Sequence, residues 1–405
     1  MVSSSHAPRF ALVLFSLLAA AHSGLSTGCS SDDDENAPPD TVACQSVVRA
    51  TDEKSLLDGV TNSSAGACVV VTGALSSPLP VVVKEGVALV GAKGKHASIT
   101  VTGPAGSSAV FLSARAQLGN IDVLASPKIG VSVTGADVRI FDVKVTGSKN
   151  AGIAILPEKG ASQVTLENVI AEKNAYGVYV SGDGVSVVMK HGRIAENGGT
   201  SLSAGAGLIV VSGARVELQE VTVEKNEGTG VLLDGASTRA VILSSIVSEN
   251  RERGIWAQGL QGTLDAPALE IQSTDIQKNR IVGVGGVELK GIIIVGGSVK
   301  ETVASPVPTN LATNELIGDG IGIYSGSTDF KIERTNFAAN ERAAGVVDGT
   351  EVGIIIVGGK VEPGPGLKFV VQNNKANVQI DDVDKSVLDK PLGISAPTIK
   401  VPTIL

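Results

Sequence analysis

A short polar phrase ending in asparagine and glycine recurs along the chain. In its fullest form a charged residue or pair precedes Asn, and a Gly a few residues later opens an aliphatic run. The phrase is marked by Asn150, Asn174, Asn197, Asn226, Asn250, Asn279 and Asn340. Between Asn150 and Asn279 the marks are 23 to 29 residues apart. Such a period is the signature of a stacked repeat protein, because one unit cannot bury its apolar face without neighbours.

The residues between the marks favour short strands over helices. Gly accounts for 49 of the 405 residues and aromatic residues for 3%. Segments such as Val164-Thr165-Leu166-Glu167 alternate apolar and polar residues, which places Val164 and Leu166 inside the stack and the other two outside. Three strands of about five residues with their turns fill one repeat, so residues 69–380 predict an all-β array of roughly 12 coils.

A resemblance to a known class agrees with this prediction. The run VVVKEGVALVGAKGKHASITVTG at residues 81–103 resembles the opening rungs of right-handed parallel β-helices in the pectate-lyase-like class. The resemblance implies a single-stranded right-handed solenoid. The resemblance is informative about the fold, but it does not determine an activity.

Both ends of the array have their own sequence character. Residues 44–68 predict an N-terminal cap with a short helix that begins at Thr51 as N-cap and presents Leu56, Leu57 and Val60. Residues 381–405 contain Pro391, Pro397 and Pro402. We expect this segment to be an extended tail that folds back along the coils or closes their end.

The N-terminus carries an export signal. Residues 1–28 contain a signal-length apolar stretch, and Leu25-Ser26-Thr27-Gly28-Cys29 resembles the bacterial lipobox. Ordinary cleavage after Ala21 is the alternative. Acylation of Cys29 would leave Cys44 and Cys68 as a disulfide pair, which fits an exported chain with three Cys.

The same resemblance predicts the location of the chain. Ser30, not Asp, follows Cys29, which implies anchoring to the outer membrane of a Gram-negative bacterium. Residues 29–43 are rich in Ser, Asp and Pro and predict a disordered acidic tether.

Charge and composition exclude several classes of partner. The formal net charge is −8 with no basic cluster, which argues against nucleic acid. Cys, His and Met are scarce, so we expect no cofactor and no metal centre. We expect a monomer that contacts a polysaccharide or a surface protein.

The recurring asparagines have a structural role in this interpretation. An Asn amide both donates and accepts hydrogen bonds, and Asn tolerates left-handed backbone angles. Stacked Asn side chains therefore predict a ladder along the axis. A calcium or sugar site is the alternative.

No catalytic group assembles from the sequence. The mature chain has two histidines, His96 and His191, and His191 lies in a predicted turn with solvated charges. The outward row of the alternating strands is predicted as Arg139, Thr165, Ser186, Glu217, Ile242, Glu270 and Lys331. Its one acid pair, Glu217 and Glu270, is two coils apart. This pair is the catalytic alternative to a solvated face.

The strand after each Gly predicts an apolar column on the outside of the stack, formed by Ala154, Tyr179, Ile209, Leu232 and Trp256. Either a loop or the Pro-containing tail covers it, or Tyr179 and Trp256 form a binding surface for a glycan or protein.

The sequence thus favours a non-catalytic surface or periplasmic lipoprotein with a rigid face for adhesion, glycan binding or protein binding. The alternative is a carbohydrate-active enzyme, either a polysaccharide lyase or a glycoside hydrolase. An accessory protein of a metal or sugar pathway is a third possibility.

Overall fold

The computed structural model describes residues 37–381 and Ser386, except for gaps at 96, 104–105, 125–127, 158–159, 199–204, 307–315, 350–351, 363–364 and 375–377. The described residues all lie in one compact unit. The predicted signal peptide, Cys29, His96 and most of the C-terminal tail lie outside the described residues.

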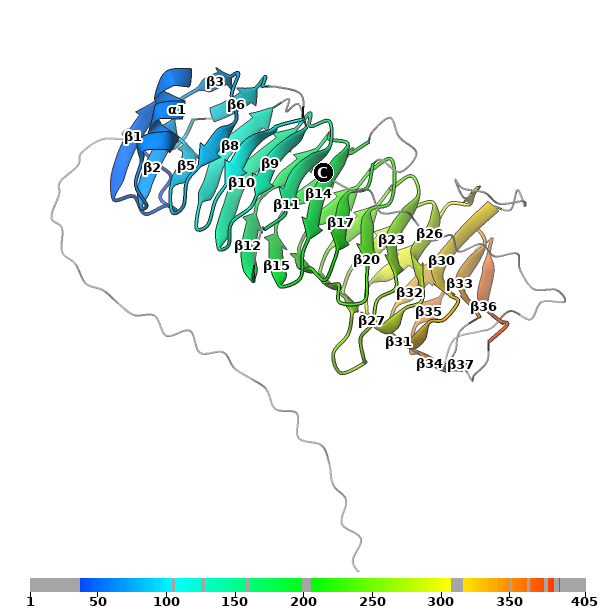
Figure 1. Cartoon of the computed structure of the whole chain (residues 1–405). Helices are drawn as coiled ribbons and strands as arrows, with labels where there is room; N and C mark the ends of the chain where they lie inside the picture. Colours follow the sequence, from blue (N-terminus) through cyan, green and yellow to red (C-terminus); the bar gives the residue numbers. More distant parts are fainter. Residues whose placement is uncertain are drawn as a thin grey trace, which may run out of the picture. The chain divides into compact units, whose positions relative to one another are not determined.

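Strands stack in parallel from β1 to β36 (Figure 1), and two ladders form one continuous sheet, sheet A. The first ladder contains β1 (Ser46–Ala50), β2 (Ala67–Val71), β5 (Ala88–Gly91), β8 (Gln117–Leu124), β10 (Val138–Thr146), β12 (Ser162–Glu167), β15 (Val185–Lys190), β18 (Arg215–Gln219), β21 (Arg239–Leu243), β24 (Leu269–Gln272), β27 (Lys290–Val295), β31 (Thr328–Glu333), β34 (Val352–Val357) and β37 (Val378–Asp381). The second ladder contains β3 (Ala74–Ser77), β6 (Ala97–Val101), β13 (Ile170–Glu172), β16 (Arg193–Ala195), β19 (Thr222–Glu224), β22 (Ile246–Ser248), β25 (Asp275–Gln277), β28 (Ser298–Lys300), β32 (Asn336–Ala338) and β35 (Lys360–Val361). In β8 and β10 the two ladders run together as one long strand.

The third ladder forms a separate sheet, sheet B. It contains β4 (Val81–Val83), β7 (Ser108–Leu112), β9 (Ile129–Val133), β11 (Ala151–Ile155), β14 (Tyr176–Ser181), β17 (Leu208–Val211), β20 (Val231–Asp234), β23 (Arg253–Gln258), β26 (Ile281–Val287), β30 (Leu316–Tyr324), β33 (Ala343–Asp348) and β36 (Leu367–Gln372). A short strand, β29 (Ser305–Pro306), pairs antiparallel with β30 and is the thirteenth strand of this sheet. The described part of the chain therefore has one sheet B strand for each of 12 coils, which confirms the predicted number.

The core fills the space between the sheets. Val164 and Leu166 of β12 are buried there, while Thr165 and Glu167 face outward, as the alternation predicts. Buried Val, Ile and Leu continue in the same way from coil to coil and form one long cluster. Each coil buries little apolar surface alone, so the stacking supplies most of the stability.

The asparagine ladder is present in six of the seven predicted positions. Asn197 donates through Nδ2 to the Ala171 carbonyl at 3.1 Å and to Oδ1 of Asn226 at 2.8 Å. Asn226 repeats both contacts one coil later, with Ile194 and with Asn250. The side chains of Asn174, Asn250, Asn279 and Asn340 also donate to a carbonyl of the preceding coil.

Asn150 is the exception, and the prediction for it is wrong. Ser148 occupies the ladder position in that coil, because its backbone N–H donates to Oδ1 of Asn174 at 3.0 Å. The Asn150 Oδ1 is buried and has no hydrogen-bond partner among the described residues. Thr302 fills a second ladder position in the same way by donating to Asn340.

The backbone angles of the turn also differ from the prediction. The residue before Asn, not Asn itself, is left-handed: Lys173 has φ 56° and Lys225 has φ 55°. The glycine of the phrase has a separate role. A Cβ on Gly230 would lie 2.6 Å from the Asn250 Nδ2 of the next coil, so only Gly fits beside the ladder.

The N-terminal cap covers the first coil. Its helix α1 (Glu53–Asn62) buries Leu56, Gly59 and Val60. The N-cap is Asp52 and not Thr51 as predicted, because the Asp52 side chain accepts from the backbone of Ser55 and Ser55 completes a capping box. Cys44 and Cys68 form the predicted disulfide.

Residues 37–43, which the sequence assigns to the tether, contact the first coils. The Lys93 N–H donates to the Ala37 carbonyl at 2.7 Å, and Arg139 donates to the Thr41 carbonyl at 3.1 Å. Val42 is buried in a small apolar cluster with Val70, Val90 and Phe141, which is separate from the main core. Ordered contacts therefore begin earlier than predicted. No helix in the described part of the chain has the length and apolar character needed to cross a membrane.

Candidate functional site on the outer face of sheet A

The outer face of sheet A carries the row in which catalytic residues were sought. Strand register places Arg139, Thr165, Val188, Glu217, Val241, Glu270, Ile293 and Lys331 in line. The predicted row is therefore wrong at two positions. Ser186 lies opposite Gln163 and belongs to the neighbouring row, and Ile242 points into the core.

Glu217 and Glu270 are two coils apart in this row, with Val241 between them. Two inter-strand steps separate their backbones by about 9.6 Å. That distance is far from the ~5 Å of a retaining glycosidase pair and lies at the wide limit for an inverting pair. A valine between the two acids offers no group to position a water or a proton.

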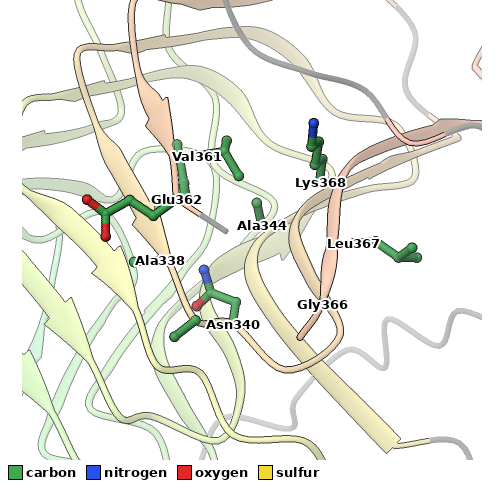
Figure 2. Close-up of a pocket in the computed structure, with 10 residues that line it drawn as sticks. Ala338, Asn340, Ala344, Val361, Glu362, Gly366, Leu367 and Lys368 are labelled. Carbon is green, nitrogen blue, oxygen red and sulfur yellow. The ribbon is translucent and has the colours of Figure 1, made fainter. Parts of the chain in front are cut away.

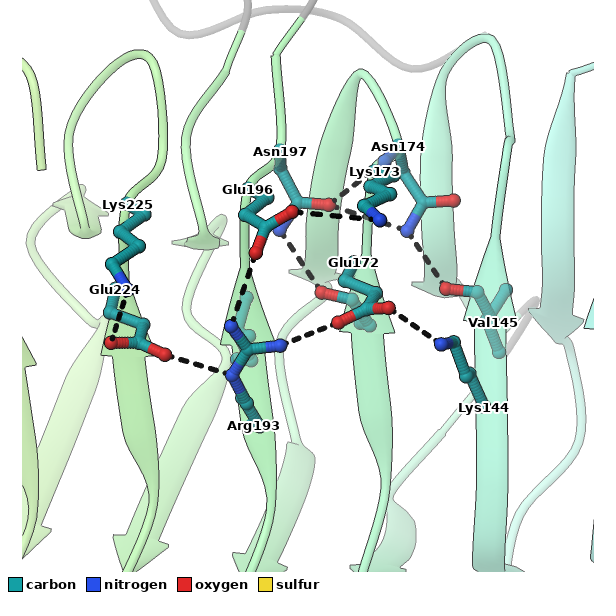
Figure 3. A network of polar contacts seen from close by, with 12 residues as sticks. Lys144, Val145, Glu172, Lys173, Asn174, Arg193, Glu196, Asn197, Glu224 and Lys225 are labelled. Atoms are coloured by element: carbon teal, nitrogen blue, oxygen red, sulfur yellow. Dashed lines mark hydrogen bonds and ion pairs between the residues drawn. The ribbon is translucent and has the colours of Figure 1, made fainter.

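Three other acids of this face, Glu172, Glu196 and Glu224, belong to an ion-pair network centred on Arg193 (Figure 3). Arg193 binds Glu172 through Nη1 at 2.5 Å and Glu224 through Nε at 2.9 Å. Lys144 binds the second oxygen of Glu172 at 2.6 Å. Glu196 is a further partner of Arg193 at 3.4 Å. The network joins four successive coils.

The network keeps the Glu172 carboxylate ionised by lowering its pKa. Burial alone would raise the pKa of Glu172, but the Lys144 hydrogen bond and the charges of Lys144 and Arg193 outweigh it and lower the pKa. A carboxylate with a lowered pKa is a poor general acid at neutral pH. The arrangement therefore stabilises the stack and does not suit proton transfer.

A groove at the edge of the same face has a different character. It is a hollow of about 450 Å³ lined by Gln163, Asp183, Ser186, Arg215 and Arg239, together with neighbouring turn residues. Arg215 and Arg239 lie opposite each other on the adjacent strands β18 and β21.

The two arginines differ in what they bind. Arg239 donates through Nη1 to the carbonyls of Ala236 and Thr238, at 3.0 and 2.9 Å. Arg215 is exposed, and its guanidinium has no hydrogen bond or ion pair within the described part of the chain. Two arginines in register on adjacent strands, one of them without a partner in the described part of the chain, suit an anionic ligand. We missed this pair in the sequence, although each Arg opens an alternating strand and the two are 24 positions apart.

The predicted outer column on sheet B is present. Ala154, Tyr179, Ile209, Leu232 and Trp256 are in register on consecutive coils. The column is buried, however: Tyr179 is 7% exposed and Trp256 is 1% exposed. Neither ring is available as a binding surface in this structure.

Beside the column lies a buried charged cluster that sequence reasoning did not find. Asp319 of β30 is fully buried, binds Arg342 through both oxygens, and accepts a hydrogen bond from the Tyr324 hydroxyl at 3.1 Å. Burial raises the pKa of Asp319 and raises the pKa of Tyr324 well above its usual value. The Arg253 guanidinium stacks 4.6 Å from the Trp256 ring.

Other predicted site residues do not come together. His191 is a left-handed turn residue with φ 51°, and its Nδ1 lies 3.1 Å from Glu220, so it is a turn residue with solvated charges as predicted. Within the described ranges, no group of three or more His, Cys, Asp or Glu side chains is placed to hold a metal ion.

A second hollow, of about 350 Å³, lies between the last coils (Figure 2). Phe337, Ala344, Val361 and Leu367 are among its lining residues. Glu362 and Lys368 lie on opposite sides of it. Its lining is mostly aliphatic side chains and backbone, which offers no acid and base in contact.

Comparison with known proteins places the fold. A family described as right handed beta helix region matches residues 129–304. The A-module of a mannuronan C-5 epimerase from Azotobacter vinelandii superposes with a TM-score of 0.62 at 14% identity, over 84% of this chain and 98% of that one. The chain has the right-handed parallel β-helix fold. No curated protein matches this β-helix in sequence.

Two further solved structures share the β-helix fold. The Dettilon tailspike protein has a TM-score of 0.56 at 15% identity and covers 80% of this chain and 68% of its own. Pectate lyase Pel9A has a TM-score of 0.52 at 11% identity and covers 82% of each chain. At these identities the similarity concerns the β-helix fold, which carbohydrate-active proteins share, and not the residues of a site.

Proposed function

We propose that this protein is a non-catalytic cell-envelope β-helix that binds an acidic polysaccharide at the groove on the outer face of sheet A. The observation that carries the proposal is the pair Arg215 and Arg239, stacked on adjacent coils in that groove. A guanidinium group forms paired hydrogen bonds with a carboxylate or sulfate, and the neighbouring Gln163 and Ser186 are suited to sugar hydroxyls.

The rigidity of the stack supports this proposal. Gln163, Ser186, Arg215 and Arg239 stand on four consecutive strands held by parallel ladders. Binding groups fixed before the ligand arrives lose little conformational freedom on binding. An extended polymer that lies across the coils would meet a polar group at each step of about 4.8 Å.

The non-catalytic part of the proposal rests on the acids of this face. Glu172 and Glu224 are held by Arg193, and Glu217 and Glu270 are separated by an aliphatic residue. We keep attachment to the outer membrane through a lipid on Cys29 within the proposal, since the N-terminal sequence supports it.

A carbohydrate-active enzyme is the second candidate. The mannuronan C-5 epimerase and the pectate lyase among the similar structures favour it. In this chain Glu217 stands two residues after Arg215 on the same face of β18, and Asp183 lines the same groove as the two arginines.

One experiment separates the candidates. The mature chain, purified without its lipid, is screened against acidic and neutral polysaccharides for both binding and change of the polymer. We expect binding of acidic polymers that weakens at least tenfold in Arg215→Gln/Arg239→Gln. Arg334→Gln, which removes an exposed charge far from the groove, should bind like the wild type.

Two outcomes contradict the proposal. Shortened or epimerised polymer that disappears in Glu217→Gln establishes the enzyme. Binding that is equal for neutral and acidic polymers and insensitive to the arginine substitutions rules out this groove.

A further inference from the structure

The turns that carry the asparagine ladder form one long edge of the stack. The ladder position is filled on eight successive coils, by Ser148, Asn174, Asn197, Asn226, Asn250, Asn279, Thr302 and Asn340. The residue immediately before and the residue immediately after each of these are exposed or half-buried. We call these two rows of residues the asparagine edge.

The first row contains the residues that precede the ladder positions, and its charges alternate in sign. In coil order it is Gly147, Lys173, Glu196, Lys225, Glu249, Lys278, Glu301 and Ala339. The six charged members have φ between 53° and 56°, so their side chains leave the backbone in the same direction. Figure 3 shows Lys173, Glu196 and Lys225 following one another on three turns.

The second row contains the residues that follow the ladder positions, and its charges do not alternate. In coil order it is Lys149, Ala175, Gly198, Glu227, Arg251, Arg280, Val303 and Glu341. Arg251 and Arg280 are like charges on neighbouring coils, about 4.8 Å apart at the backbone. Avoidance of like charges within one chain therefore does not explain this row.

The ion pairs within the edge are few and loose. Lys173 Nζ lies 3.7 Å from Glu196, and Lys278 Nζ lies 3.8 Å from Glu301. Such exposed pairs contribute little to the stability of a chain. The side chains of Glu249 and Arg280 have no ion pair within the described part of the chain. The edge thus keeps charges that a second molecule can meet.

Both rows are complementary to themselves when the order of the coils is reversed about the midpoint between Asn226 and Asn250. The pairs related by this reversal are Lys225 with Glu249, Glu196 with Lys278 and Lys173 with Glu301 in the first row, and Glu227 with Arg251, Lys149 with Glu341 and Ala175 with Val303 in the second. Five of these six pairs join opposite charges, and the sixth joins two apolar residues. In the two remaining pairs one member is a glycine, so no like charges meet.

We propose that the asparagine edge is an interface between two copies of this chain, which pack antiparallel about a two-fold axis between the coils of Asn226 and Asn250. A two-fold axis perpendicular to the stack brings each row opposite the same row of the second copy in reversed order. A parallel pair would instead bring the first row opposite the second row, with Lys278 facing Arg280 of the second copy. The charges therefore select the antiparallel pair.

The charges near the axis reinforce one another in this arrangement. Lys225 and Glu249 of one copy face Glu249 and Lys225 of the other, so four charges of alternating sign meet. Glu227 and Arg251, which already form an ion pair within one chain, make a second group of four. Networks of this kind contribute more than isolated surface pairs.

The shape and size of the edge indicate a weak dimer. A hollow of about 570 Å³ on its second half, lined by Glu249, Arg280 and Val303 among others, leaves room for side chains of the second copy. Two positions on each of eight coils are fewer than the ~20–30 residues a side of a standard interface. We therefore expect a dissociation constant in the micromolar range and a strong dependence on salt.

The dimer replaces the monomer expected from the sequence, and it goes beyond the proposed polysaccharide binding. None of the residues that line the groove with Arg215 and Arg239 belongs to the asparagine edge. Both grooves stay free in the dimer, so a long polymer that reaches both would be held more firmly than by one. Failure of either proposal leaves the other standing.

Sedimentation velocity of the chain, purified without its lipid, measures the association. We expect dimers that form with rising concentration at low salt and dissociate at least tenfold more readily in about 500 mM salt. Lys225→Glu and Glu249→Lys each create two repulsive contacts per dimer, so each variant alone should associate at least tenfold more weakly. Arg334→Glu, on a turn outside the edge, should behave like the wild type.

Mixing the two single variants gives the decisive result. In a mixed dimer the two glutamates of one variant face the two lysines of the other, so we expect association to return to the wild-type level. Stability within one chain cannot produce this recovery. Glu196→Lys and Lys278→Glu form a second matched set if a variant of the first is poorly folded. A monomeric wild type, single variants that associate like it, or a mixture that associates no better than its parts would overturn the proposal.

Discussion

Asn197 and Asn226 occupy the same position in successive coils, and the Asn197 side chain donates to Oδ1 of Asn226 at 2.8 Å while its backbone N–H donates to the same oxygen at 3.1 Å. One buried amide thus satisfies a backbone donor and a side-chain donor of its neighbour. The recurring phrase is the sequence record of this contact: Asn forms the ladder, and Gly leaves room for the next Asn.

The ladder predicts a large difference between two asparagines. Asn226→Ala removes a side chain that makes four contacts, and it leaves buried groups of both neighbours unpaired. At ~1–3 kcal/mol for each unpaired group, we expect a loss of about 3 kcal/mol or more in unfolding free energy. Asn150→Ala is the matched control, since Asn150 lies outside the ladder. Denaturant unfolding of both variants checks this, and equal losses would contradict the assignment.

The Arg193 network predicts a pH-dependent contribution to stability. The pKa of Glu172 is lowered in the folded chain, so its contribution is present above the ordinary value of 4.5 and is lost as pH falls through the lowered folded value. We expect Glu172→Gln to cost about 1.5–3 kcal/mol at pH 7 and to approach the wild type once the pH falls below the lowered pKa of Glu172 in the folded chain.

The control for this prediction is Glu227→Gln, which removes an exposed pair with Arg251. Its effect should stay below about 1 kcal/mol, because exposed ion pairs contribute little. Thermal unfolding between pH 3 and 7 measures both variants. A difference between Glu172→Gln and the wild type that grows toward acid pH would have the wrong sign for this network.

The disulfide predicts a local effect at the first coils. Cys44 and Cys68 enclose a loop with a sequence separation of 24, and closing such a loop stabilises the folded chain by about 3.5 kcal/mol in the chain-entropy account. Cys44→Ser/Cys68→Ser should speed hydrogen exchange in β1 and α1 and leave sheet B near Trp256 unchanged. Uniform destabilisation of all coils would instead indicate that the cap controls folding of the whole stack.

The proposed lipid on Cys29 predicts membrane attachment. Cys29→Ser should move the protein from the membrane fraction to the soluble fraction of the producing cell. Cys44→Ser is the control, since it also removes a thiol but leaves the lipobox intact. Retention of the Cys29→Ser protein in membranes would rule out this anchor.

Much of the fold could be predicted because the same local pattern of residues recurs in every coil. The alternation at Val164 and Leu166 recurs in coil after coil, and the Asn marks fix which residues stack. Asn150 is outside the ladder because the backbone N–H of Ser148 donates to the neighbouring Asn174, and this contact needs no side-chain amide. Register was misread at Ser186 and Ile242, where the turn lengths between strands shift the alternation by one or two residues.

The sites were less predictable, for two physical reasons. Trp256 and Tyr179 were predicted to point outward, and the sequence left open whether they are covered or form a binding surface; both are buried. Asp319 and Arg342 form a buried pair that no sequence pattern marks. Arg215 and Arg239 were not recognised as a pair because they are 24 positions apart in a chain of negative net charge. Only the strand register places them next to each other.

The most direct test of the account measures binding and polymer length in the same sample. The mature chain is titrated with an acidic oligosaccharide in a calorimeter, and the recovered sugar is then analysed for length and stereochemistry. We predict binding that weakens with added salt and is lost in Arg215→Gln/Arg239→Gln, with unaltered sugar recovered. Cleaved or epimerised sugar, or undiminished binding by the double variant, would contradict the account.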